Sequence, residues 1–265
     1  MRTLAMLATL MLLAIPAHAY DITDLERDMR AQIEKMMKEV GDVTLAQEAT
    51  FEGGASGMSG MKATTYVKGE RWRSDAVMSG SKQSANIEVT TLYDGTDMWS
   101  VMMGMKQKLP TGAVGQGGPT SLWNEFPDDA KVLGEESVGG RAAWKVQYDA
   151  PKGSPRGQGA TTTWVDKTTF MPIQIETKAS GKPVRMVMSD FRKVKGYDVA
   201  HLTEMFTGGD KTMTMKIVKL ETNKGIPDDL FDPAKLAGGE GMDMNAMMKK
   251  AMEMQKQMEK GKGNE

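Results

Sequence analysis

The sequence predicts a mainly β fold in which antiparallel strands form a sandwich or a barrel. Apolar and polar residues alternate in many short segments, as is typical of strands with one buried side and one solvent-facing side. These segments recur at roughly 8–12-residue spacing without interleaved helices. Turns such as Asp94-Gly95 and Gly139-Gly140 separate them, and direct hairpins favour antiparallel pairing. The predicted strands are 43–49, 63–67, 87–93, 98–103, 143–148, 161–165, 173–177, 184–188, 202–206 and 213–217.

Two segments depart from this strand pattern and predict helices. In residues 21–40, apolar residues such as Leu25, Met29 and Ile33 recur at three- and four-residue spacings, and Gly41 follows as a stop. Residues 119–130 begin with a proline, which the first turn of a helix tolerates. We expect this second, short helix to carry Leu122, Trp123 and Phe126.

The first nineteen residues have the pattern of a cleavable signal peptide. Arg2 precedes a twelve-residue apolar run, and Ala17-His18-Ala19 forms a small-x-small cleavage site. The run is shorter than the roughly twenty apolar residues that cross a bilayer. We therefore expect export to the periplasm with cleavage after Ala19, and no transmembrane segment in the mature chain. The alternative is a buried N-terminal helix.

Composition excludes several classes of function. The chain has no cysteine, so disulfides, thiolate metal sites and cysteine nucleophiles are absent. It has two histidines, one of them in the signal peptide, which argues against histidine-based triads and metal centres. The formal net charge is −1, so no basic field indicates nucleic acid as a partner. We expect no enzyme activity, no cofactor and no metal site built on these residues.

Methionine is unusually frequent, with 26 in the chain. Its flexible, polarizable thioether suits an adaptable apolar cavity, and soft thioethers also favour Cu(I). The simplest alternative is that methionine replaces leucine as a core residue. Residues 237–265 form a separate methionine-rich tail, which reads as an amphipathic docked helix or a disordered segment. A third interpretation is copper binding by the tail pairs Met242 with Met244 and Met252 with Met254.

Four motifs follow one another along the segment from Asp21 to Pro233. These are Tyr66-Val67-Lys68-Gly69 through Trp72, Tyr93-Asp94-Gly95 through Trp99, Trp164-Val165-Asp166-Lys167 through Ile173, and Ile226 through Pro233. In the order and spacing of these motifs the segment resembles the LolA-like outer-membrane lipoprotein-sorting proteins, which are periplasmic lipoprotein carriers.

The resemblance implies that residues 20–236 form one domain, an incomplete antiparallel barrel of about eleven strands whose interior can hold an apolar ligand. It implies that the N-terminal helix and the inserted short helix act as lid or plug, and that the concave face binds acyl chains. One departure is Gly69, which stands where the family has an arginine that helps to hold the lid closed. We therefore do not extend lipoprotein hand-over to this chain.

The functional hypothesis is a monomeric periplasmic binding or carrier protein for a lipid or acylated ligand. The alternatives are an envelope-sensing or protein-interaction module of the same fold, and copper binding by the tail. Each candidate ligand-binding residue can equally be a core residue, because aromatic and methionine side chains serve both roles. The residues predicted to line a hydrophobic cavity are Trp72, Trp99, Met103, Trp123, Phe126, Trp144, Met186, Met188, Met213 and Met215.

Overall fold

A computed structural model describes most of the segment predicted to be the folded domain. The predicted signal peptide, most of the predicted short helix and nearly all of the tail lie outside the described residues. Of the predicted helix 119–130, the described end at 126–130 is a turn. The described residues are 20–52, 58–80, 86–109, 126–150, 158–237 and 239–240.

The N-terminal helix α1 spans Ile22–Glu39, as predicted. Asp21 caps it, because its carboxylate accepts from the backbone nitrogens of Thr23 and Asp24. The Asp24 carboxylate in turn accepts from the backbone nitrogen of Asp21, which completes a capping box. The apolar stripe of the helix is buried at Leu25, Met29 and Ile33, so α1 is held by its packing.

All described strands belong to one sheet of fourteen strands that does not close on itself. The spatial order is β14-β6-β5-β4-β3-β2-β1-β13-β12-β11-β10-β9-β8-β7, antiparallel throughout except that β14 is parallel to β6. This confirms the predicted unclosed antiparallel barrel with an N-terminal helix. The first arm of the sheet comprises β1 (Asp42–Phe51), β2 (Met58–Lys68), β3 (Arg71–Gly80), β4 (Ile87–Tyr93), β5 (Met98–Met102), β6 (Met105–Leu109) and β14 (Gly239–Glu240).

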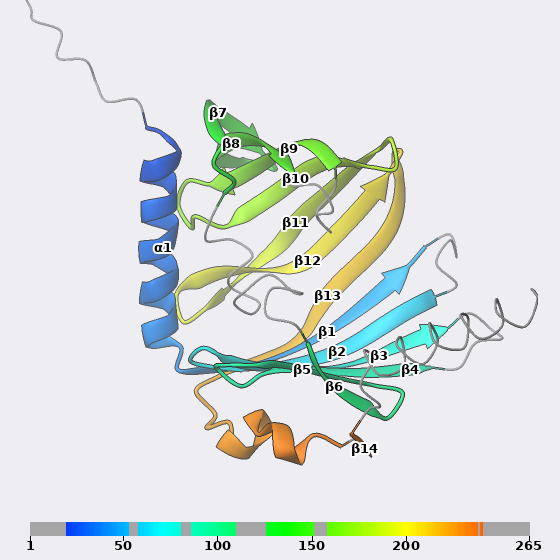
Figure 1. Ribbon diagram of the computed structural model, residues 1–265. Coiled ribbons are helices and arrows are strands. Elements are labelled where there is room, and N and C mark those ends of the chain that lie inside the picture. The colour runs from blue at the N-terminus through cyan, green and yellow to red at the C-terminus, as the bar shows by residue number, and fades with distance from the viewer. Residues whose placement is uncertain are drawn as a thin grey trace, which may run out of the picture.

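The second arm meets the first at the pair formed by β1 and β13. Figure 1 shows the two arms, with β7 to β12 in the upper part of the view and β2 to β6 in the lower part. The second arm comprises β7 (Lys131–Val138), β8 (Arg141–Ala150), β9 (Gln158–Asp166), β10 (Pro172–Ala179), β11 (Lys182–Val194), β12 (Tyr197–Thr207) and β13 (Asp210–Thr222).

The sheet has more strands than the eleven expected. β3, β6 and β7 were not among the predicted segments, since charged residues interrupt their apolar alternation. Each forms because a neighbouring strand supplies its hydrogen-bonding partners over a hairpin: β2 for β3, β5 for β6 and β8 for β7. Tertiary pairing thus overrides a weak local pattern.

The two faces of the sheet are covered by different elements. On one face, which we call the inner face, Leu25 and Met29 of α1 pack in a cluster with Val146 and Val165. On the opposite, outer face lie two 3-10 helices, η1 (Asp228–Phe231) and η2 (Pro233–Lys235). Phe231 of η1 packs there with other buried residues, and Figure 1 shows both short helices beneath the first arm. The remaining members of that cluster are Leu92, Val101, Ile226 and Leu236.

The strand register assigns each side chain to a face. Directly opposed residues of an antiparallel pair point to the same side, and successive residues of one strand alternate. Side-chain hydrogen bonds agree with this assignment across two pairings. Thr161 contacts Thr177 at 3.0 Å between β9 and β10, and Thr65 donates to Ser74 at 3.2 Å between β2 and β3. All four side chains lie on the inner face by register.

Candidate functional site on the inner face of the sheet

The strand methionines gather on the inner face. The register places there every strand methionine beyond the irregular start of β2, and none of these lies on the outer face. Methionine thus distinguishes the two sides of the sheet. The inner-face strand methionines are Met61, Met78, Met98, Met102, Met105, Met186, Met188, Met205, Met213 and Met215.

These methionines form continuous rows that run across the strands. The first row crosses from β10 to β1 over five strands, each residue being the register partner of the next. We call it the first methionine row. Its members are Ile175, Met186, Met205, Met213 and Phe51.

A second methionine row lies beside the first and crosses seven strands from β11 to β4. No charged residue stands in either row, so the two together form a continuous neutral strip across the middle of the sheet. The members of the second row are Met188, Thr203, Met215, Ala49, Met61, Met78 and Ile87.

The side chains of these rows are only partly covered. Apart from the buried Ala49, every residue of both rows is of intermediate exposure. One thioether also takes part in a polar contact, because Gln47 Nε2 donates to Met215 Sδ at 3.7 Å. The strip is therefore apolar and partly exposed, and the Met215 sulfur accepts a hydrogen bond.

Closer to the end of α1 that leads into β1, the inner face of the first arm is no longer purely apolar. One row there is polar and includes Thr65, Ser74 and Ser100, with Thr65 and Ser100 buried. The next row is apolar and aromatic, with Trp72 opposite both Val67 and Tyr93. The inner face of the first arm thus has apolar rows on both sides of a polar one.

Six of the predicted site residues lie on the inner face, in three places. Met186, Met188, Met213 and Met215 belong to the methionine rows. Trp72 lies in the aromatic row and is 8% exposed.

The sixth, Trp144, lies on β8 beside α1. Its ring stacks on that of Tyr20 with centroids 4.3 Å apart, and the Lys167 ammonium lies 4.3 Å from the ring centroid. Phe126 also packs in this cluster, edge-on to Tyr148 at 5.7 Å. Both aromatic rings therefore help to hold α1 against the second arm.

Two further predicted residues lie elsewhere. Trp99 is on the outer face, where it packs in the cluster that contains η1, and its Nε1 donates to Asp94 Oδ2 at 3.1 Å. Met103 is in the turn between β5 and β6 and is 74% exposed. Neither contributes to the inner face. Trp123 lies outside the described residues.

Sequence reasoning did not single out several inner-face methionines. Met61 and Met78 are neighbours in the second row, and Met205 stands between two predicted residues in the first row. Met205 could have been placed in the first row from the sequence, since it occupies an alternating position in a predicted strand. Met78 could not have been placed, because its strand was not predicted.

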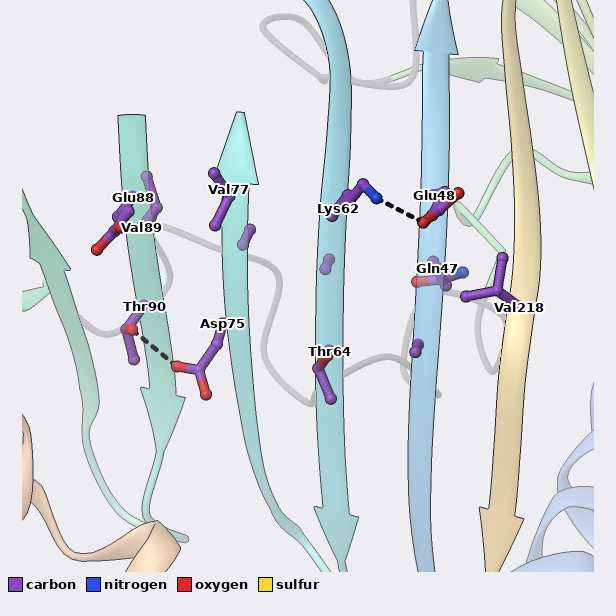
Figure 2. Close-up of a pocket in the computed structure, with 13 residues that line it drawn as sticks. Gln47, Glu48, Lys62, Thr64, Asp75, Val77, Glu88, Val89, Thr90 and Val218 are labelled. Atoms are coloured by element: carbon purple, nitrogen blue, oxygen red, sulfur yellow. Dashed lines mark hydrogen bonds and ion pairs between the residues drawn. The ribbon is translucent and has the colours of Figure 1, made fainter. Parts of the chain in front are cut away.

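The outer face carries a groove of different chemistry, with a volume of about 500 Å³. Figure 2 shows it over β4, β3, β2, β1 and β13. An ion pair of 2.9 Å joins Lys62 to Glu48, and Thr90 donates to Asp75 at 2.7 Å. Its wall combines charged and polar side chains with alanines and valines, and it lies opposite the methionine rows, so it does not extend them.

The titratable groups with shifted pKa values serve the framework. Burial alone would raise the pKa of Asp166, but donation from Arg141 and from Thr169 lowers it below the ordinary value. Arg141 bridges Asp166 at 2.6 Å and Asp198 at 3.0 Å, which ties β8 and β9 to β12. Within the described residues, no group of three or more His, Cys, Asp or Glu side chains is placed to hold a metal ion. None of the described helices is long and apolar enough to cross a membrane.

Comparisons with known proteins bear on the fold. A family model described only as an uncharacterized protein matches residues 125–238, and no curated protein matches the sequence. A crystal structure of a DUF1329 family protein from Desulfovibrio piger is similar, with 17% identity and a TM-score of 0.56. So is that of a putative outer membrane lipoprotein-sorting protein domain from Vibrio parahaemolyticus, with 14% identity and a TM-score of 0.56. Each match covers 80% of this chain and 96% of the other.

These likenesses confirm the fold that the resemblance implied. At this level of identity they establish the shared fold alone. Function has to be argued from the inner face itself.

Proposed function

We propose that the mature protein is a non-catalytic periplasmic binding or carrier protein for a lipid or acylated ligand, and that the methionine rows hold the acyl chain. The observation that carries the proposal is the segregation of strand methionines to the partly exposed inner face. A sheet that only needed a core would bury these side chains against another layer. Here apolar, adaptable side chains are left partly open.

The dimensions of the strip fit an acyl chain. Neighbouring strands lie ~4.8 Å apart, so the seven-strand row is about 29 Å long, measured along the sheet from β11 to β4. The hydrocarbon core of a whole bilayer is ~30 Å thick, so one acyl chain needs about half of the row. Burial contributes roughly 0.8 kcal/mol per CH₂, and a single long chain is therefore enough for useful affinity.

The test compares variants of neighbouring residues on β13, whose side chains lie on opposite faces of the sheet. Met213→Glu and Met215→Glu each place a charge in a methionine row, whereas Thr214→Glu places the same charge on the outer face of β13. We expect the inner-face variants to lose binding of a fluorescent fatty acid by at least tenfold and Thr214→Glu to bind as the parent does. Circular dichroism and thermal melting check that all three fold.

Native mass spectrometry of protein purified from the cell envelope gives the second measurement. We expect co-purified species with masses of lipids or acylated molecules. Protein that is uniformly empty and takes up no acyl probe would contradict the proposal, as would equal losses in the Met213→Glu and Thr214→Glu variants. One stoichiometric protein partner without lipid would favour the protein-interaction alternative.

A further inference from the structure

We propose that Met186, Met205 and Met213 form a three-thioether site for a soft monovalent cation, with Cu(I) as the ion. The three residues are consecutive register partners on β11, β12 and β13, in the middle of the first methionine row. This site does not involve the methionine tail, and it shares residues of the first methionine row with the proposed acyl chain.

The register gives the three thioethers a common location. Directly opposed residues of an antiparallel pair have Cβ atoms about 4.5–5.5 Å apart. A methionine side chain has three rotatable bonds and adapts its shape, so the sulfur of the central Met205 is within reach of both neighbours. All three side chains are of intermediate exposure, which leaves an ion a route from solvent.

Two more thioethers lie one row away. Met188 and Met215 follow Met186 and Met213 by two residues on the same strands, and therefore share their face. The Gln47 amide donates to Met215 Sδ at 3.7 Å, so at least one sulfur on this part of the inner face is already engaged as an electron-pair donor. A fourth thioether, that of Met188, thus lies one row from the trio.

The surrounding chemistry selects a soft ion of low charge. Thioethers are neutral and soft, and they favour Cu(I), whereas Ca²⁺ and Mg²⁺ require hard oxygen ligands. No carboxylate stands in either methionine row, and no described cluster of His, Cys, Asp or Glu competes for a divalent ion. β-Branched residues suit strands better than methionine does, so strand propensity alone does not account for three thioethers in one row.

The experiment separates sulfur chemistry from hydrophobicity. The full mature chain is compared with the triple variant Met186→Leu, Met205→Leu, Met213→Leu, because such volume-conserving swaps usually cost under ~1.5 kcal/mol each. The matched control is Met61→Leu, Met98→Leu, Met105→Leu, in which no two residues are register partners. Anaerobic Cu(I) titration against a colorimetric Cu(I) chelator measures the number of bound ions.

We expect the row triple to bind one equivalent of Cu(I) less than the parent, and the control triple to match the parent. All three chains keep the tail, so the difference reports on the sheet. Binding of the fluorescent fatty acid is measured separately on the parent chain, so a failure of acyl binding is distinguished from a failure of Cu(I) binding. Equal Cu(I) stoichiometry and affinity in the parent and the row triple would overturn the site.

Discussion

The carboxylate of Asp42 holds the segment that follows β13 against the start of β1. It is buried at the start of β1 and accepts hydrogen bonds from the backbone nitrogens of Lys224, Gly225 and Ile226. Burial alone would raise the pKa of Asp42, but these donors and the Lys68 ammonium hold it below the ordinary value of 3.8. The carboxylate thereby anchors the segment that leaves β13 and leads to η1 on the outer face.

This anchor makes stability sensitive to acid. Because the folded-state pKa of Asp42 is depressed, its contribution is fully present above pH 3.8 and is lost as the pH falls through the lower folded value. We expect Asp42→Asn to lower the free energy of unfolding at pH 7 by about 1–3 kcal/mol. Urea denaturation from pH 7 downward should show this difference shrinking below pH 3.8. Asp210→Asn, at the exposed start of β13, should change stability little at either end of the pH range. A deficit for Asp42→Asn that stays constant at all pH values would contradict this origin of the stability.

At the residue scale, the sequence identifies the apolar candidate residues better than it identifies the face of the sheet on which each lies. Trp72 and Trp99 occupy similar contexts, each following a valine- or leucine-containing strand, yet they lie on opposite sides of the sheet. Alternation fixes which residues of a strand share a side, but only the register with neighbours fixes which side is inner. Met103 fails for another reason, since it falls in a turn that separates two short strands.

At the scale of single elements, the stability of each helix or hairpin depends on what it packs against. α1 is joined to the second arm through Leu25 and Met29, which are 0% and 1% exposed. We expect Leu25→Ala to reduce the free energy of unfolding by about 2–5 kcal/mol, since it removes buried methyl groups and leaves a cavity. Lys35→Ala on the exposed side of α1 is the control and should change stability by less than ~0.5 kcal/mol. Chemical denaturation measures both, and similar values for the two would show that α1 is not anchored by this stripe.

The hairpin of β5 and β6 presents methionines to solvent. Met103 is 74% exposed, and Met102 and Met105 flank it at 41% and 52%. Sulfoxide formation follows access to the sulfur, so we expect dilute peroxide to oxidise Met103 before Met29, which is 1% exposed. Peptide mass spectrometry over time gives the order. Oxidation of Met29 at the rate of Met103 would mean that α1 leaves the sheet readily.

Most elements, unlike their faces, follow from the sequence. The helix 22–39 has its cap, its apolar spacing and its stop residue in one continuous segment, and it forms as expected. Strands with strong alternation, such as Thr161 to Val165 in β9, also form where predicted. Charge-interrupted β7 and the short β6 depend on pairing with β8 and β5, and a single segment carries no sign of its partner.

On the scale of the whole molecule, the sheet has a well-paired centre and weaker ends. β1 and β13 are each hydrogen-bonded on both sides over most of their length, whereas β7 and β14 end the sheet, and β14 has two residues. We expect amide hydrogen exchange to be slowest in β1 and β13 and fastest at the two ends. Hydrogen-exchange mass spectrometry checks this. Faster exchange in β13 than in β7 would contradict the architecture.

The union of β1 with β13 also has a consequence for biogenesis. Val43 pairs with Thr222, so the seam between the two arms joins residues almost a full domain apart along the polypeptide. Because the chain is synthesised from its N-terminus, β1 exists long before its partner β13. The two arms can therefore join into one sheet only after nearly the whole domain has been made, and until then the inner faces of the two arms lack their common centre.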